Sequence, residues 1–374
     1  MMPNVIVSTV GTSLLTNQIA PKNEEERGWN QQLRDYANCE GETPERVKAI
    51  IHTLKERARE SLAKADIAKI RRSSAELNGI YGLYNGDLAQ GKQDLHFLIA
   101  TDTLQGQTTA KVVEEFLRSH GLTAISYTPA GLSTATTQTF AEGIDDLIVW
   151  LQNTVKPLWD TYKVYFNMVG GFKSLQGYMN TIGMFYADAI LYIFEGQNSE
   201  LITIPRLPIK VDAQLLAPHA AALALMDAGA GLSPDAVDGI PEAMLGDYQG
   251  KKVLSTWGIL TWNEAKAELL AKDLLQFPKL LYTHTFRADY NQVKIPKQRV
   301  ELQQDLAKVS QTLQDANGDT RALRSVAYSP YQDSNGIDHF RVNLSLRISC
   351  RKVENGLELR YYGTHDHVER KEGL

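Results

Sequence analysis

The chain reads Asn4-Val-Ile-Val-Ser-Thr-Val10 near its start and continues with Gly11-Thr-Ser13. The first stretch is a mostly β-branched run without charges, which predicts a strand buried on both faces. The glycine and the two hydroxyl residues that follow predict a small-residue loop directly after that strand. This stretch therefore indicates a covered parallel sheet, with a loop suited to a ligand at the carboxyl end of a strand.

Runs of the same kind recur along the first half of the chain, at residues 95–100, 123–127, 162–168 and 189–194. Helical patterns lie between them, at 109–119, 138–154 and 173–186. Strands that alternate with helices at this spacing predict βαβ units and a doubly wound, Rossmann-like α/β sheet. Residues 21–92 interrupt the alternation. They are rich in charge, with a helical pattern at 44–74, and we expect a mainly solvated helical insertion. The alternative is that one or two helices pack against the sheet edge or a partner subunit.

The second half of the chain departs from this rhythm. Residues 211–276 are rich in Ala and Leu and predict a small helical connector, with a winged helix as the alternative. From 277 to 374, a helix at 296–316 precedes strands at 338–343, 345–353 and 357–362, with a turn at 333–336. Helix before antiparallel strands predicts a small α+β domain. The sequence thus indicates three parts, 1–210, 211–276 and 277–374.

Composition limits the function classes. A length of 374 residues with 43% hydrophobic and 22% charged residues predicts several folded domains and excludes wholesale disorder. No apolar run approaches the roughly 20 residues that span a bilayer, and the start resembles no signal peptide, so we expect a cytoplasmic protein without a membrane segment. Two cysteines, Cys39 and Cys350, make neither a disulfide framework nor a metal pair. Residues 276–374 carry 15 Lys plus Arg against 12 Asp plus Glu, which weakly favours an anionic partner.

Two loops suit a ligand at the edge of the predicted sheet. One is Gly11-Thr12-Ser13, and the other runs from Asn167 to Ser174 through Gly170-Gly171. Paired glycines let the backbone approach an anion, hydroxyls donate to phosphate oxygens, and Lys173 adds a charge. We expect a phosphate-bearing ligand here. The alternative is that both turns only close the sheet.

These loops, in the contexts Val7-Ser-Thr-Val-Gly-Thr-Ser-Leu14 and Gly170-Gly-Phe-Lys173, resemble the CARF domain, the CRISPR-associated Rossmann fold of type III effectors. The resemblance covers about residues 1–210 and implies a homodimer that binds a cyclic oligoadenylate, usually the tetramer, as an allosteric activator. Some CARF domains also cleave this ligand, with residues matching Ser13 and Lys173. The ligand-binding positions that the resemblance implies are Gly11, Thr12, Ser13, Thr101, Asp102, Thr103, Asn167, Gly170, Gly171 and Lys173.

The C-terminal strands predict a hairpin that ends in histidines. Asn355-Gly356 between alternating runs predicts a tight turn with positive φ angles at both residues. Beyond the second strand come His365 and His367, with arginines at 341, 347, 351 and 360 around them. Cations beside groups that titrate near neutral pH suit phosphate chemistry. The alternative is an ordinary solvated edge hairpin.

This segment resembles the RelE superfamily of ribosome-dependent messenger-RNA nucleases, through His339-Phe-Arg-Val342, Leu346-Arg-Ile348 and Tyr361-Tyr-Gly-Thr-His365. The resemblance covers about residues 277–374 and implies cleavage without a metal or cofactor, by attack of the RNA 2′-hydroxyl on the adjacent phosphate. It implies that His365 is the general acid or base, and that Arg341 and Arg347 form a charge clamp if they share a sheet face. Arg324 would bind backbone phosphate. His367 and His339 are the next candidates for proton transfer.

The segment departs from the RelE pattern in two places. Asp333 and Asp338 stand where lysines are common, and Glu369 stands where an aromatic residue is expected four positions after His365. Tyr328, Tyr331 or Tyr362 would then have to stack the RNA base. Arg360 and His365 also match the short motif of HEPN ribonucleases, but that motif belongs on an all-helical domain, so we set that family aside.

Together these features predict a cyclic-oligoadenylate-activated ribonuclease of type III CRISPR defence, acting on messenger RNA at the ribosome. Two rivals remain. One is a ring nuclease that only degrades cyclic oligoadenylate. The other is a CARF transcriptional regulator with 212–276 as a DNA-binding winged helix.

Overall fold

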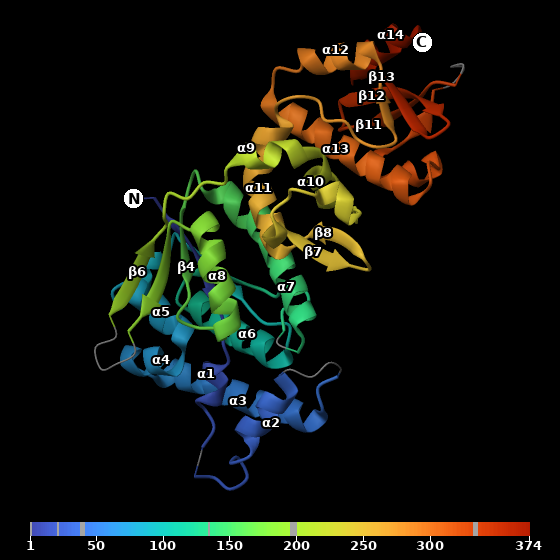
Figure 1. The fold of residues 1–374 in the computed structure, drawn as a ribbon. Coiled ribbons are helices and arrows are strands. Elements are labelled where there is room, and N and C mark those ends of the chain that lie inside the picture. The colour runs from blue at the N-terminus through green and yellow to red at the C-terminus, as the bar shows by residue number, and fades with distance from the viewer. Residues whose placement is uncertain (1, 21, 38–41, 134, 195–199, 332–335) are drawn as a thin grey trace. The chain divides into compact units, whose positions relative to one another are not determined.

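The computed structural model describes the whole chain except residues 1, 21, 38–41, 134, 195–199 and 332–335 (Figure 1). Cys39 and Asp333 lie outside the described residues, as does most of the turn predicted at 333–336. The contacts divide the chain into two compact units, Met1–Ile209 and Lys210–Leu374. Each unit is described by itself.

The first unit is built on a six-stranded sheet in the order β3-β2-β1-β4-β5-β6. Five strands are parallel, and β6 runs antiparallel to β5. This mixed α/β arrangement is compatible with the predicted Rossmann-like fold. The edge strand β6 was not predicted, because it is short, largely exposed and ends in a proline. The strands are β1 (Asn4–Thr9), β2 (Leu95–Ile99), β3 (Thr123–Tyr127), β4 (Lys163–Asn167), β5 (Ala189–Ile193) and β6 (Leu201–Pro205).

Helices cover both faces of this sheet, as Figure 1 shows for α8 in front of the strands. On one face, α3 (Glu45–Lys64) and α6 (Leu104–Ser119) share a core with Ile6 and Leu98. On the other face, α8 (Lys173–Tyr186) approaches closely at Gly183, where a Cβ would meet Ile190 and Phe166. The remaining helices between β3 and β4 are α7 (Thr137–Trp150), η2 (Leu151–Val155) and η3 (Lys156–Leu158).

The insertion at 21–92 is not a solvated excursion, and that prediction was wrong. Val47, Ile50 and Leu54 of α3 are buried and belong to the core of the first unit. Their spacing is that of one apolar helix face, which the high charge content obscures. Arg57 and Glu26 anchor the preceding loop through two hydrogen bonds of 2.9 Å. The other helices in this region are α1 (Ser13–Thr16), α2 (Trp29–Ala37), α4 (Ile67–Ser73), α5 (Ala75–Leu83) and η1 (Leu88–Gly91).

Residues 211–276 contain a hairpin as well as the predicted helices. β7 (Leu245–Tyr248) and β8 (Lys251–Leu254) flank Gln249 and Gly250, which both have positive φ as a two-residue hairpin requires. Leu223 and Trp262 share one apolar core with Leu306 of the C-terminal segment. The helices are α9 (Ala213–Leu216), η4 (Ala217–His219), α10 (Ala220–Asp227), η5 (Pro234–Val237), η6 (Glu242–Met244) and α11 (Thr256–Leu270).

The rest of the second unit is a five-stranded sheet in the order β10-β11-β12-β13-β9, with β9 parallel to β13 and the other pairs antiparallel. α13 packs on one face, where Leu306 shares one apolar core with Phe340 and Ile348. The elements are β9 (Leu280–Tyr282), α12 (His284–Gln292), α13 (Pro296–Asp315), η7 (Thr320–Val326), β10 (Ser329–Pro330), β11 (Asp338–Arg341), β12 (Leu346–Val353), β13 (Gly356–Thr364) and α14 (His365–Glu372).

The C-terminal hairpin forms as predicted, but its turn differs. Val353 pairs with Gly356, so the loop residues are Glu354 and Asn355. Of the predicted Asn-Gly pair only Gly356 has a positive φ, of 148°. A Cβ there would lie 1.9 Å from the Lys279 carbonyl oxygen, which accepts a hydrogen bond from Leu357. The glycine is therefore required by the close approach of β9.

Candidate functional site

Two loops that the sequence singled out meet at the switch point of the first sheet, where β1 lies between β2 and β4. We call residues 10–13 and 168–172 the switch-point loops. Thr9 Oγ1 donates to the Gly170 carbonyl at 2.6 Å, and a Cβ on Gly11 would lie 3.0 Å from the Gly171 nitrogen. Open α/β sheets bind ligands beyond the carboxyl ends of their strands at such a point.

One end of this site offers groups that suit an anion. Gly171 has a φ of 94°, and α8 begins two residues later at Lys173, which is exposed. The N-cap residue Phe172 makes no side-chain hydrogen bond to the first turn. The N–H groups and the positive end of the helix dipole are therefore presented beside a lysine.

The other end contains a carboxylate that sequence reasoning missed. Glu76 is fully buried, and its Oε1 accepts the Gly11 N–H at 2.6 Å. Its Oε2 accepts the Ser74 hydroxyl at 2.7 Å, and a Cβ on Gly170 would lie 2.3 Å from Oε1. The Gly11 N–H is thus used within the fold. An anion is better placed at the Gly171–Lys173 end, where α8 begins at a lysine.

The remaining predicted ligand residues divide into two groups. The Ser13 hydroxyl oxygen is buried and has no hydrogen-bond partner among the residues that the structure describes, and Thr12, which precedes α1, makes no side-chain capping bond to that helix. The others are used by the fold. Asn167 is buried and donates to Ser8 Oγ, Thr103 caps α6 by accepting the Gly106 N–H, and Asp102 accepts the Gly131 N–H. Thr101 bonds to Thr103, their hydroxyl oxygens 3.0 Å apart.

A second candidate site lies on the C-terminal sheet. Arg341 of β11 and Arg347 of β12 are directly opposite in an antiparallel pair, as are His339 and Ser349. Opposed residues share a face, and this face is the one opposite the α13 core. Like charges directly opposite each other destabilise a sheet, so the arginine pair carries a cost that an anionic ligand would relieve. The shared face that the charge clamp requires is therefore present.

His365 comes directly after the second strand of the hairpin, in a helix. It is the first residue of α14, and Thr364 caps that helix by accepting the His367 N–H. The His365 Nε2 atom lies 2.8 Å from Glu369 Oε1, one helical turn later. Side-chain exposure is 44% for His365 and 31% for Glu369, so the pair is reachable from solvent.

His339 connects these groups into one cluster. Burial lowers the pKa of the His339 imidazole below its usual value. The positive charges of Arg347, Arg341 and His365 lower it further. Its ring packs against that of Tyr331, with centroids 4.2 Å apart. We call His339, Arg341, Arg347 and His365 the basic face.

The other residues predicted for this site make different contacts. His367 turns toward α12, with its Nε2 atom 3.5 Å from Asp289 Oδ1 and its ring against Gly363. Arg360 donates to Glu372 Oε1 at 2.9 Å, so it makes a structural ion pair rather than a HEPN-like pair with His365. Arg324 is exposed at η7, and no contact found among the described residues joins it to the basic face.

The structure also places the residues at which the segment departs from the RelE pattern. Asp338 is buried and accepts the Tyr328 hydroxyl, so its charge does not face an approaching RNA. Tyr362 is buried in the apolar core. Of the three candidate tyrosines, Tyr331 is the one whose ring packs on His339. The i to i+4 spacing of His365 and Glu369 was the signal that could have revealed their pairing.

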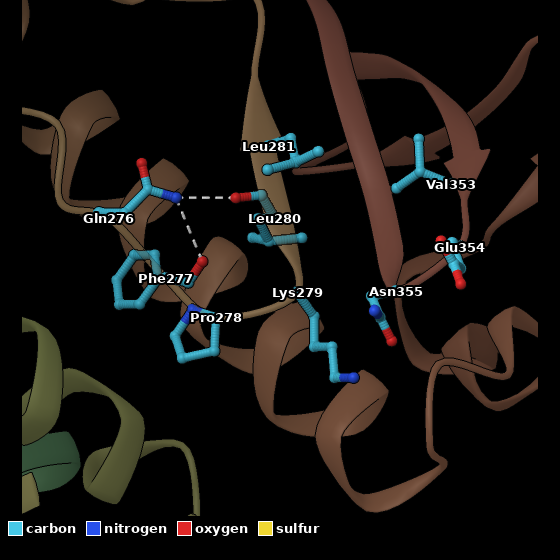
Figure 2. Close-up of a pocket in the computed structure, with 9 residues that line it drawn as sticks. All are labelled: Gln276, Phe277, Pro278, Lys279, Leu280, Leu281, Val353, Glu354 and Asn355. Carbon is cyan, nitrogen blue, oxygen red and sulfur yellow. Dashed lines mark hydrogen bonds between the residues drawn. The ribbon is translucent and has the colours of Figure 1, made fainter.

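A cavity of about 560 Å³ opens beside the edge strand β9 and the turn between β12 and β13 (Figure 2). It is lined mainly by apolar groups and contains none of the predicted site residues. Gln276 Nε2 donates to the carbonyl oxygens of Leu280 at 2.8 Å and Phe277 at 3.4 Å. The side chain thereby caps a polar group of the edge strand, which disfavours pairing with another strand.

Within the described part of the chain, no cluster of three or more His, Cys, Asp or Glu residues could hold a metal ion. Over the same residues, no helix combines the length and the apolar character needed to cross a membrane.

Residues 71–207 match a family model described as a CRISPR-associated protein, Cas_APE2256. The match begins within α4, ends two residues after β6 and includes Gly170 and Lys173. Gly11, Thr12 and Ser13 lie before it, as does β1. This similarity supports a role in CRISPR defence.

Proposed function

We propose that the chain is an endoribonuclease of type III CRISPR defence, activated by cyclic oligoadenylate and cleaving messenger RNA on the ribosome. The observation that carries the nuclease assignment is the opposed Arg341–Arg347 pair, with His365 directly after Thr364, the residue that pairs with Leu346 next to Arg347. The similarity of residues 71–207 to a CRISPR-associated family supports the biological setting. Such a protein would act in the cytoplasm.

The proposed reaction needs a proton carrier and cations. The RNA 2′-hydroxyl attacks the adjacent phosphorus, and the bond to the 5′-oxygen breaks to leave a 2′,3′-cyclic phosphate and a 5′-hydroxyl. His365 takes the proton from the nucleophile or gives one to the leaving oxygen. Arg341 and Arg347 stabilise the negative charge that develops on the phosphate oxygens. Neither a metal nor a cofactor takes part in this proposal.

The proposed sensor is the first unit. A cyclic oligoadenylate, most simply the tetramer, would place its phosphates at the Gly171–Lys173 ends of the switch-point loops. A two-fold symmetric ring is best met by two copies of the same surface, so we propose a homodimer.

A ring nuclease is the second candidate. The Ser13 hydroxyl, for which the described part of the chain offers no hydrogen-bond partner, lies on one switch-point loop, and Lys173 follows the other. The regulator is less favoured, because the short helix before the β7–β8 hairpin reads Glu-Ala-Met and brings no basic residue.

One experiment separates these functions. Purified protein is incubated with messenger RNA, with and without ribosomes and with and without cyclic tetra-adenylate. Cleavage that requires both additions supports the proposal. Cleavage of free RNA supports a nuclease but not a ribosome-dependent one, whereas loss of the cyclic tetra-adenylate with intact RNA identifies a ring nuclease.

A further inference from the structure

Glu369 follows His365 by one turn of α14, with Oε1 2.8 Å from Nε2. A pair at this spacing on an exposed helix stabilises the helix only slightly. Its position also places it beside His339, because both residues of the pair shift the pKa of that imidazole. The positive charge of His365 lowers the pKa of His339, and Glu369 raises it. Through its contact with His365, the carboxylate lies at the basic face.

A free carboxylate at this place would work against the proposed reaction. It would repel the RNA phosphate that Arg341 and Arg347 attract. Held by the imidazole Nε2 atom, the same carboxylate is directed to the ring and orients it. This is the relation in which a base is itself oriented by a third group, as in nucleophile–base–carboxylate sites generally.

The two ring nitrogens of His365 have unequal partners. Nε2 faces Glu369, which is about two-thirds buried, whereas Nδ1 lies 3.2 Å from Asp366, whose side chain is 99% exposed. An exposed carboxylate turns into solvent readily and gives up its partner to a substrate. Nδ1 is therefore the nitrogen that RNA can reach.

We infer that Glu369 is a positioning residue that keeps the His365 Nε2–H engaged and presents Nδ1 to the RNA. Nδ1 then accepts the proton of the 2′-hydroxyl or donates one to the 5′-oxygen, while the proton on Nε2 stays in place. This inference rests on the proposed nuclease function. Glu369 stands where the RelE pattern has an aromatic residue, and the inference gives it a role other than stacking on an RNA base.

The test compares Glu369→Ala, Glu369→Gln and Asp366→Ala in the full chain, with ribosomes and cyclic tetra-adenylate present. We expect Glu369→Ala to lower kcat by about 10-fold to 100-fold with KM little changed, since a misplaced group slows the chemical step. Glu369→Gln should recover most of the loss, because its amide oxygen still accepts from Nε2–H. Asp366→Ala should change kcat by no more than about twofold, in keeping with an exposed pair. Thermal melts check that each variant is folded.

A second readout needs no cleavage. In protein labelled with ¹⁵N-histidine, the neutral His365 ring should carry its proton on Nε2, in the wild type and in Glu369→Gln. The tautomers should mix in Glu369→Ala. Wild-type cleavage by folded Glu369→Ala, with His365→Ala inactive, would overturn the inference and leave the nuclease function standing. If His365→Ala cleaves at the wild-type rate, the active site lies elsewhere and the inference falls with it, whereas a wild type that leaves RNA intact would remove the nuclease function itself. An unchanged tautomer in Glu369→Ala would overturn the pairing in either case. If Asp366→Ala lowers kcat as much as Glu369→Ala does, the claim that Nδ1 is the nitrogen presented to RNA would be wrong.

Discussion

The two histidines of α14 differ in their surroundings although they are close in sequence. His365 and His367 are separated by about 200° around the helix, since each residue advances about 100°. His365 is part of the basic face and pairs with Glu369, whereas the His367 Nε2 atom lies 3.5 Å from Asp289 Oδ1 on α12. His365 is therefore the candidate catalytic group, and His367 has a structural role.

We expect His365→Ala to lower RNA cleavage by about 100-fold or more, because general acid–base groups contribute 10²-fold to 10⁴-fold. His367→Ala is the matched variant on the same helix and should have a much smaller effect. Cleavage is measured with ribosomes and activator, and thermal melts confirm folding. Equal activity of His365→Ala and wild type would show that the active site lies elsewhere.

At the proposed ligand site the residue to test is Lys173. Replacing it by Ala should weaken binding of cyclic tetra-adenylate several-fold, because a charge-assisted contact to phosphate is lost at the start of α8. Lys92→Ala, an exposed lysine after η1, serves as the control. Calorimetry measures both. Unchanged affinity in Lys173→Ala would remove this lysine from the site.

At the scale of elements, α14 is held on the C-terminal sheet by its last turn. Glu372 is 1% exposed and accepts from Arg360 and from the Ser349 hydroxyl, the latter at 2.6 Å. These bonds join the helix to β13 and β12. Since His365 begins the same helix, the docking of its C-terminal end also sets the position of the candidate catalytic group.

Replacing Glu372 by Ala should destabilise the second unit by about 3 kcal/mol, because Arg360 loses its partner in a largely buried place. Chemical denaturation followed by spectroscopy measures the free energy of unfolding. Glu354→Ala, in the exposed hairpin turn, is the control and should change it little. A loss no larger than that of the control would mean that α14 is not held by this ion pair.

At the scale of the whole molecule, a buried network ties together the amino ends of β1 and β2. Asp94 accepts from the Asn4 N–H at 2.7 Å and from the Tyr84 hydroxyl at 2.8 Å. The His96 Nε2 atom lies 3.0 Å from that hydroxyl. Burial lowers the pKa of His96 to about 4, against the opposing charge of Asp94. His96 is therefore uncharged at neutral pH in the folded first unit.

This network predicts a loss of stability in acid. The unfolded chain binds a proton on His96 near pH 6.5, whereas the folded chain binds it only near pH 4. The free energy of unfolding of the first unit is therefore unaffected by His96 above pH 6.5. It decreases as the pH falls from 6.5 toward 4, by at most about 3 kcal/mol. Denaturation of wild type and His96→Gln across this range measures the difference. Equal pH dependence in the two proteins would contradict the assignment.

Local pattern was sufficient for much of this fold. The strands at β1 to β5, α8 from Lys173 to Tyr186, and the C-terminal hairpin follow from runs of β-branched residues, periodicity and turn residues. These features depend on neighbours in sequence, so they can be read without the tertiary structure. The meeting of the two switch-point loops also followed, because parallel strands end at the same edge of a sheet.

Other features depend on residues that are distant in the chain. The sequence could not show that Glu76 takes the Gly11 N–H, because the two are 65 residues apart. It could not place Asp338 in the core, Arg360 on Glu372, or Arg341 opposite Arg347, since strand register and helix docking decide these. The sequence alone thus determined which elements form and which residue types could do the chemistry. The tertiary structure decided which of those residues share one face, because that depends on pairing and burial across the whole unit.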